Sequence, residues 1–177
     1  MKWKPGDPRP DTAAMIRVDQ AGEYGATRIY GGQLAVMGDR SDAARAIAGM
    51  ANQEERHRRF FDALMIDRGV RPTALQPLWK VGGHALGAVT AAIGPAAAMA
   101  CTVAVETEID RHYADQLAQL SDADPVLADA VRDFQAEELE HRDAALAAGA
   151  ETAIAYPLLS GAIRLVCRAA IQLSKRI

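Results

Sequence analysis

Several sequence patterns that mark common protein classes are missing from this chain. It has two cysteines, Cys101 and Cys167, and no CxxC spacing, which argues against a disulfide framework and fits a reducing compartment. We expect both cysteines to pack as small apolar residues. The net charge of −3 provides no basic field, so no nucleic-acid partner is expected. No GxGxxG motif follows a strand-like segment, so the chain itself offers no such dinucleotide site.

Strand-like alternation of apolar and polar residues is missing as well, and long segments run between clusters of glycine and proline. This pattern predicts an all-α protein. Asp11 or Thr12 suits the N-cap of the first helix, Gly69 the end of the second, and Pro125 the first turn of the last. The main helices are expected at about residues 12–37, 42–67, 95–120 and 125–149.

The chain is expected to form one domain over residues 12–177, because 177 residues with half of them apolar can bury one substantial core. Residues 1–11 hold three prolines and no apolar run. We therefore expect an extended N-terminal lead-in there that is neither a signal peptide nor an amphipathic transit peptide.

The longest apolar stretch, residues 81–105, is nominally long enough to cross a bilayer. It is built from alanine and glycine rather than leucine, and Gly94-Pro95 interrupts it. This favours a helix or turn before Pro95 followed by a tightly packed core helix. The Gly83-xxx-Gly87 spacing would allow close helix packing, and His84 is expected to line the core or a pocket.

The last segment, residues 157–177, alternates apolar residues with arginine and lysine at helical spacing. This pattern predicts an additional C-terminal amphipathic helix. Two placements remain open: a membrane surface, or the side of the bundle with the cations in water.

A repeat of chemical groups runs through the chain. Glu54-Glu55-Arg56-His57 recurs 84 positions later as Glu138-Leu139-Glu140-His141, and single glutamates, Glu23 and Glu106, precede the two motifs by 31 and 32 positions. A Glu-x-x-His pair occupies one helix face, so it can present an oxygen and a nitrogen together. A glutamate from each of two helices with Glu-x-x-His from each of the other two is the ligand pattern of di-iron and di-manganese bundles.

The repeat therefore predicts a dinuclear metal site in a ferritin-like four-helix bundle with an internal two-fold repeat. The predicted ligands are Glu23, Glu54, His57, Glu106, Glu138 and His141. Four carboxylates balance two divalent ions, and carboxylate with imidazole suits iron or manganese. Spacing does not fix which glutamates bridge. We predict that Glu54 and Glu138 do, with Glu23 and His57 on one metal and Glu106 and His141 on the other.

Residues near the ligands are further candidates. His112 and Tyr113 lie about two turns after Glu106 and could line an approach to the metals for a quinone or a reductant. Asp110 and Asp19 could orient a ligating histidine, or could form ion pairs at the surface; for Asp110 the partner would be Arg111 or Arg45.

At these residues the sequence closely resembles the demethoxyubiquinone hydroxylase family, ferritin-like di-iron monooxygenases of ubiquinone biosynthesis. The resemblance runs from about Met15 to the end of the chain, and all six ligand positions are filled. The stretches that carry it are IRVDQAGEYGA at 16–26, RPT at 71–73, PLW at 77–79, AMACTVAVE at 98–106 and EELEH at 137–141.

The resemblance implies a monooxygenase that uses two iron ions, O2 and electrons from NADH or another donor to hydroxylate the ring of a polyprenylated demethoxyubiquinol. It also implies peripheral membrane association, on the cytoplasmic face of a bacterial inner membrane or the matrix side of the mitochondrial one. A lipid-binding partner protein and a homo-oligomer stay open. The alternatives are a ferritin-like ferroxidase, a manganese catalase, or a non-enzymatic quinone-binding bundle.

Overall fold

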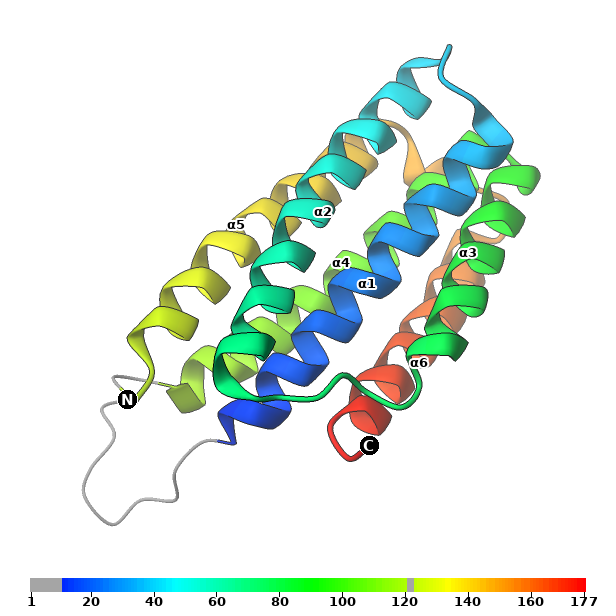
Figure 1. Ribbon diagram of the computed structural model, residues 1–177. Coiled ribbons are helices and arrows are strands. Elements are labelled where there is room, and N and C mark those ends of the chain that lie inside the picture. The colour runs from blue at the N-terminus through cyan, green and yellow to red at the C-terminus, as the bar shows by residue number, and fades with distance from the viewer. Residues whose placement is uncertain (1–10, 121–122) are drawn as a thin grey trace.

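The computed structural model describes residues 11–120 and 123–177, and every regular element in these ranges is a helix (Figure 1). The predicted all-α class is therefore confirmed. Of the predicted lead-in at residues 1–11, residues 1–10 lie outside the described residues and Asp11 is the N-cap of the first helix. The helices are α1 (Thr12–Met37), α2 (Asp42–Arg68), α3 (Gln76–Ile93), α4 (Pro95–Leu120), α5 (Pro125–Ala147), the short 3-10 helix η1 (Ala150–Thr152) and α6 (Tyr156–Ser174).

The helix ends follow local sequence signals. Asp11, Ser41 and Asp124 each accept a hydrogen bond from a backbone N–H in the first turn of the helix that follows, at 2.9–3.1 Å. Pro125 occupies the first turn of α5. Gly69 ends α2 in the left-handed conformation, with φ 63°, which a residue without a Cβ adopts easily.

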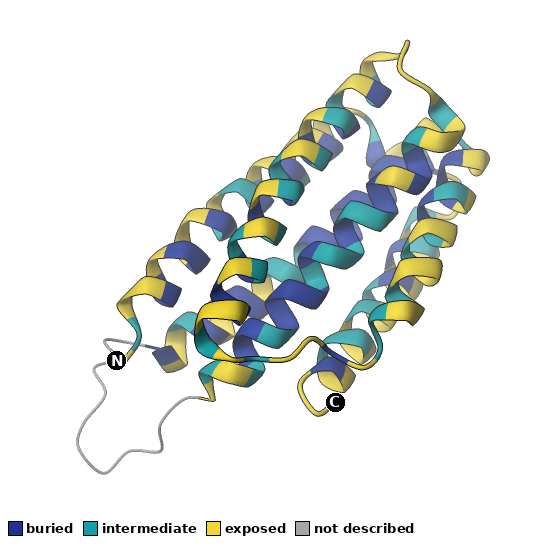
Figure 2. Cartoon of the chain, in the orientation of Figure 1, coloured by how far each residue is buried: buried dark blue, intermediate teal, exposed yellow. Residues whose placement is uncertain are grey.

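Four helices, α1, α2, α4 and α5, form the bundle that surrounds the predicted ligands. Helix α1 packs against α2 and α4 against α5, while α3 lies on α1 and α6 lies on α4 (Figure 1). The buried residues lie along the inward faces of the bundle helices and give α1 and α4 long buried faces (Figure 2). The predicted bundle with an added C-terminal helix is confirmed, and the segment before Pro95 is a full helix.

Glycines bring α3 into backbone contact with α1. A Cβ on Gly87 would lie 1.9 Å from the carbonyl oxygen of Ile29, and one on Gly32 would lie 2.1 Å from that of His84. The close packing predicted from Gly83-xxx-Gly87 is therefore confirmed. The prediction that His84 lines the core or a pocket was wrong, because the glycine face of α3 meets α1 and leaves the His84 side chain exposed.

Helix α6 packs on the bundle, and two of its partly exposed cations share one carboxylate of α4. Glu108 of α4 accepts hydrogen bonds from Arg164 at 2.6 Å and from Arg168 at 2.8 and 2.9 Å. Ile163 is buried beside this clamp. Four other apolar residues of α6 face outward: Leu158, Leu165, Val166 and Leu173.

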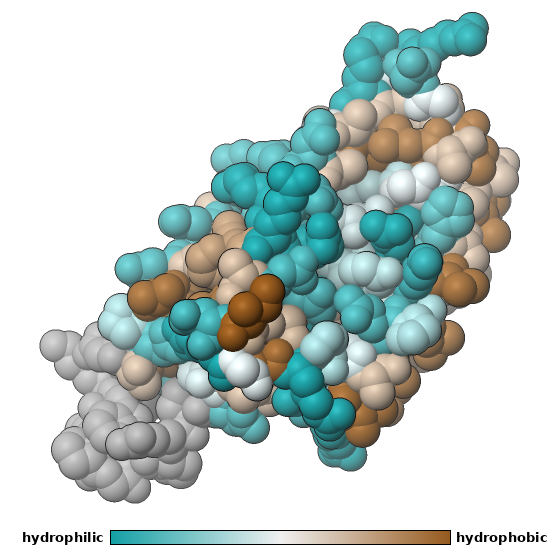
Figure 3. Space-filling model, viewed as in Figure 1, coloured by the Kyte–Doolittle hydropathy of each residue, from teal (hydrophilic) through white to brown (hydrophobic). Residues whose placement is uncertain are grey.

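Exposed apolar side chains gather on α3 and α6, and we call them the α3–α6 apolar face. Apolar side chains are visible along the margin of the molecule where α3 lies (Figure 3). The residues of this face are Leu78, Val81, Val89 and Ile93 on α3 and Leu158, Leu165, Val166 and Leu173 on α6.

Among the described residues, no helix combines the length and the apolarity needed to cross a membrane. The break at Gly94 divides the apolar stretch 81–105 between α3 and α4.

Candidate metal centre

The structure brings all six predicted ligands together inside the bundle. Helix α1 contributes Glu23, α4 contributes Glu106, and the two Glu-x-x-His motifs come from α2 and α5. Each of the six is at most 2% exposed. Their ligand atoms fall into two groups of four, within 4.8 Å of one another in each group. The groups are Glu23, Glu54, His57 and Glu138, and Glu54, Glu106, Glu138 and His141.

Both histidines turn the same ring nitrogen, Nδ1, toward the carboxylates. Nδ1 of His57 lies 3.2 Å from Oε1 of Glu138 and 3.5 Å from Oε2 of Glu23. Nδ1 of His141 lies 3.1 Å from Oε2 of Glu138 and 3.2 Å from Oε1 of Glu54. Glu54 and Glu138 thus lie at the centre, shared by both groups.

The donor set fits two metal ions because it is buried and under-satisfied. Within the described residues, six inward atoms have no hydrogen-bond partner: both oxygens of Glu54, one each of Glu23, Glu106 and Glu138, and Nδ1 of His57. A buried polar atom without a partner is costly and rare in a folded protein. These atoms are carboxylate oxygens and an imidazole nitrogen, the ligands that iron and manganese accept.

Burial and mutual repulsion dominate the electrostatics of the metal-free cluster. Burial, then the negative charge of Glu138, raises the pKa of both Glu54 and Glu106 well above the ordinary value of 4.5. Burial also opposes the charge of His57, but the close carboxylates of Glu138 and Glu23 raise its pKa to about 10. Burial opposes ionisation of Glu138 too, yet close contacts with His141 and His57 lower its pKa to about 2. Without metal, bound protons neutralise part of the negative charge of the four carboxylates.

Two tyrosines cross the bundle to hold the outer glutamates. The Tyr30 hydroxyl donates to Oε1 of Glu106 at 2.6 Å, and the Tyr113 hydroxyl donates to Oε1 of Glu23. Each tyrosine lies seven positions after one outer glutamate and bonds the other one. Tyr113 was a sequence candidate, but Tyr30 was missed, although the repeat offset of 83 positions relates the two.

The outer ring nitrogens of the histidines have crossed partners as well. Nε2 of His57 lies 2.9 Å from Oε2 of Glu137, and Nε2 of His141 lies 2.8 Å from Oε1 of Gln53. Gln53 and Glu137 are 84 positions apart, each directly before the glutamate of its motif. The sequence interpretation missed both, although the repeat carries their signal.

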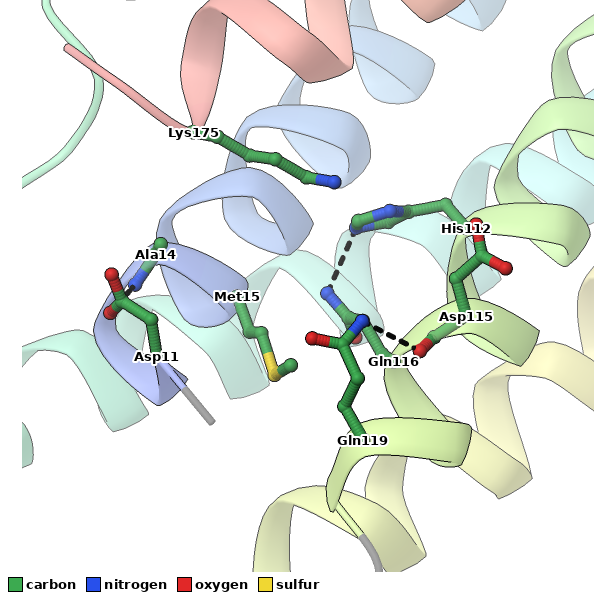
Figure 4. Close-up of a pocket in the computed structure, with 8 residues that line it drawn as sticks. All are labelled: Asp11, Ala14, Met15, His112, Asp115, Gln116, Gln119 and Lys175. Atoms are coloured by element: carbon green, nitrogen blue, oxygen red, sulfur yellow. Dashed lines mark hydrogen bonds between the residues drawn. The ribbon is translucent and has the colours of Figure 1, made fainter. Parts of the chain in front are cut away.

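His112 lies apart from the ligands, at a half-open polar pocket of about 130 Å³ (Figure 4). Its Nε2 is 3.2 Å from Oδ1 of Asp19 and 2.8 Å from Nε2 of Gln116. Burial raises the pKa of Asp19, a shift that its contacts with His112 oppose. Lys175, from the end of α6, lines the same pocket. Asp19 therefore orients His112 rather than a predicted ligand histidine.

Asp110 does not orient a ligating histidine, and it forms an ion pair, as predicted, but with Arg142 rather than with Arg111 or Arg45. It accepts a hydrogen bond from Gln135 at 2.7 Å and lies 3.9 Å from Arg142. Both groups belong to α5, which faces this side of α4. The cysteines behave as predicted: Cys101 is buried, Cys167 is partly buried, and both are free.

The fold and the donor set define a class: helical bundles in which four helices present a buried, carboxylate-rich site for two metals. A family model described as "Ubiquinone biosynthesis protein COQ7" matches residues 10–174. The chain belongs to this family.

Curated relatives agree with the family match. A protein of Rhodospirillum rubrum named 3-demethoxyubiquinol 3-hydroxylase is 53% identical, over 98% of this chain and 82% of the relative. The human NADPH-dependent 3-demethoxyubiquinone 3-hydroxylase, mitochondrial, is 50% identical over 92% of this chain and 76% of the relative. The Saccharomyces cerevisiae 5-demethoxyubiquinone hydroxylase, mitochondrial, is 40% identical over 92% of this chain and 77% of the relative.

Proposed function

We propose that this protein is a 3-demethoxyubiquinol 3-hydroxylase, a monooxygenase of ubiquinone biosynthesis. The observation that carries the proposal is the buried cluster of four glutamates and two histidines in a chain of this family. The reaction replaces one ring C–H of the quinol by C–OH. It consumes O2, two electrons and two protons, and it releases water.

The cofactor we propose is a pair of iron ions. Glu23 and His57 would hold one ion, Glu106 and His141 would hold the other, and the two central glutamates would bridge. The six atoms without partners and the sharing of Glu54 and Glu138 support this assignment. When bound, the pair would supply the redox chemistry that activates O2.

The chain's own residues orient the donors and keep water away. The crossed tyrosines hold Glu23 and Glu106 from outside, so a second oxygen of each stays directed inward. Phe134 stacks on the His57 ring with centroids 4.0 Å apart and closes one side of the site. A rigid, dry cage of this kind lowers the cost of arranging ligands around each metal.

We propose that NADH or NADPH supplies the two electrons. The mouse, human and rat relatives are named NADPH-dependent, while NADH is what the resemblance implies. His112 and Tyr113 are proposed to lie on the approach of the reductant or the quinol. Tyr113 donates a hydrogen bond to Glu23, and its sequence neighbour His112 lines the polar pocket; both observations support this placement.

We also propose that the protein works at a membrane surface, as its polyprenylated substrate requires. The α3–α6 apolar face supports this, because a group of exposed apolar side chains is typical of an interaction site. The proposed location is the cytoplasmic face of a bacterial inner membrane, or the matrix side of the mitochondrial inner membrane. A lipid-binding partner protein or a second copy could share this face.

The test is anaerobic reconstitution with Fe(II), metal counting, and mass spectrometry of the product after adding demethoxyubiquinone, NADH or NADPH, and O2. We expect about two irons per chain and a product heavier by one oxygen. Two irons with iron or peroxide turnover and no quinone product would favour the ferroxidase or catalase alternative. Absence of stoichiometric metal would overturn the proposal and favour a quinone-binding bundle.

A further inference from the structure

The two histidines of the cluster have chemically different partners on their outer nitrogens. A carboxylate, Glu137, faces Nε2 of His57, and an amide, Gln53, faces Nε2 of His141, at nearly equal distances of 2.9 and 2.8 Å. The two partners occupy the same position of the repeat. The ligand set is therefore two-fold symmetric, while the groups directly behind the histidines are not.

Hydrogen bonding defines the direction of both contacts. Ionised Glu137 only accepts, so Nε2 of His57 carries a hydrogen, and Nδ1, which faces the cluster, is the nitrogen that would bind a metal. The Gln53 amide points its Nε2 toward Glu137 at 3.5 Å, which leaves its oxygen to accept from Nε2 of His141. Arg56 also bonds Glu137 and holds it in place. Both histidines thus present Nδ1 inward, one supported by a charge and the other by a neutral dipole.

We propose that Glu137 makes the two metal positions unequal, so that the Glu23/His57 position binds a divalent ion more tightly than the Glu106/His141 position. A carboxylate behind an imidazole raises its basicity as a ligand more than an amide does. Glu137 and Gln53 act through the histidines and are positioning residues. The inference rests on the proposed metal site and adds an order of filling to it.

Variants that keep only one of the two metal positions test the inequality directly. Calorimetry with Mn(II) as the probe measures the affinity of each. Glu106→Ala leaves the His57 position and Glu23→Ala leaves the His141 position. We expect the first to bind Mn(II) about tenfold more tightly, the lower end of effects seen for groups behind a ligand. Adding Glu137→Gln to each variant should remove the tighter Mn(II) binding at the His57 position. It should change the Mn(II) affinity of the His141 position by less than about twofold.

A swap variant keeps composition and charge constant. Gln53→Glu combined with Glu137→Gln exchanges the two partners, and we expect the tighter position to move to His141. Mössbauer spectra of the iron-loaded protein give a second readout. The natural sequence should show two distinct doublets, and the single variant Glu137→Gln should show converged doublets. A packing defect would not produce this signature.

Three results would overturn the inference: equal affinities in the two single-position proteins, an unchanged preference in the swap variant, or an equal loss at both positions in Glu137→Gln. None of these results prevents the natural protein from binding two metals, so the proposed function survives. Failure of the natural protein to bind metal would overturn both, and the helical circular dichroism of each variant identifies one that has not folded.

Discussion

At the scale of residues, the metal-free cluster is held by protons and hydrogen bonds that two metal ions would replace. Glu138 lies between Nδ1 of His57 and Nδ1 of His141 at 3.2 and 3.1 Å, so it stays ionised. Glu54 also lies 3.2 Å from Nδ1 of His141, but burial and the negative charge of Glu138 raise its pKa, and that of Glu106, well above 4.5. Metal binding must displace those protons, so metal affinity should rise with pH.

The stability of the metal-free protein should fall as pH rises above about 4.5. Unfolded glutamates lose their protons near 4.5, whereas the pKa of folded Glu54 and Glu106 lies well above that value, so the folded state binds more protons once the unfolded groups have ionised. His57, whose pKa rises from 6.5 to about 10 on folding, adds to the same trend. Calorimetry of the EDTA-treated protein should show a falling Tm. The control, Glu54→Gln with Glu106→Gln, should show a flatter profile, and a Tm that rises with pH would contradict the assignment.

Replacement of one central ligand should abolish metal pairing and turnover. Glu54→Ala removes a donor shared by both groups of ligands, so we expect fewer than two irons per chain and a loss of hydroxylation of more than about 100-fold. Glu55→Ala is the matched control, because Glu55 points to Arg58 and Arg59 instead. Iron counting and product analysis of both variants check the prediction, which fails if Glu54→Ala keeps two irons.

At the scale of elements, the two added helices attach to the bundle by different physical means. Helix α3 is held by the backbone approach that Gly32 and Gly87 permit, and α6 by the carboxylate of Glu108 with two arginines. Contact through glycine tolerates no added volume on the contact face. Contact through long arginine side chains leaves the apolar side of α6 free to face outward.

A methyl group at the glycine contact should therefore separate α3 from α1. Gly87→Ala would place a Cβ 1.9 Å from a carbonyl oxygen of Ile29, and we expect a loss of about 1–3 kcal/mol in the free energy of unfolding. Gly82→Ala, on the open side of the same helix with nothing within 4 Å, should be neutral or stabilising by about 0.5–1 kcal/mol. Urea denaturation of both variants measures the difference, and equal stabilities would refute the close-contact account.

At the scale of the whole molecule, apolar surface is concentrated on the side formed by α3 and α6. Scattered exposed apolar residues also occur elsewhere, such as Ile66 on α2, which is 84% exposed. Single residues of that kind are normal, whereas a stripe along neighbouring helices indicates an interaction surface.

Charges placed on this side should release the protein from membranes. We expect Leu158→Glu with Leu165→Glu to reduce sedimentation with phospholipid vesicles by about tenfold, because two apolar groups no longer enter the bilayer and two charges resist it. Ile66→Glu with Val126→Glu, two exposed apolar positions outside the face, should bind as the natural protein does. Turnover of a short-tailed soluble quinol should be kept in both. Unchanged sedimentation of the first variant would count against the membrane surface.

The sequence by itself determined the positions of the four bundle helices and the six cluster residues, because glycine, proline and capping residues act locally and a Glu-x-x-His repeat places its members on one helix face. It did not determine which residues of neighbouring helices meet. The crossed contacts of Tyr30, Gln53 and Glu137, the outward position of His84 and the pairing of Glu108 with α6 all depend on how helices rotate against one another. Periodicity defines the faces of each helix, but only packing in three dimensions selects the partner that each face receives.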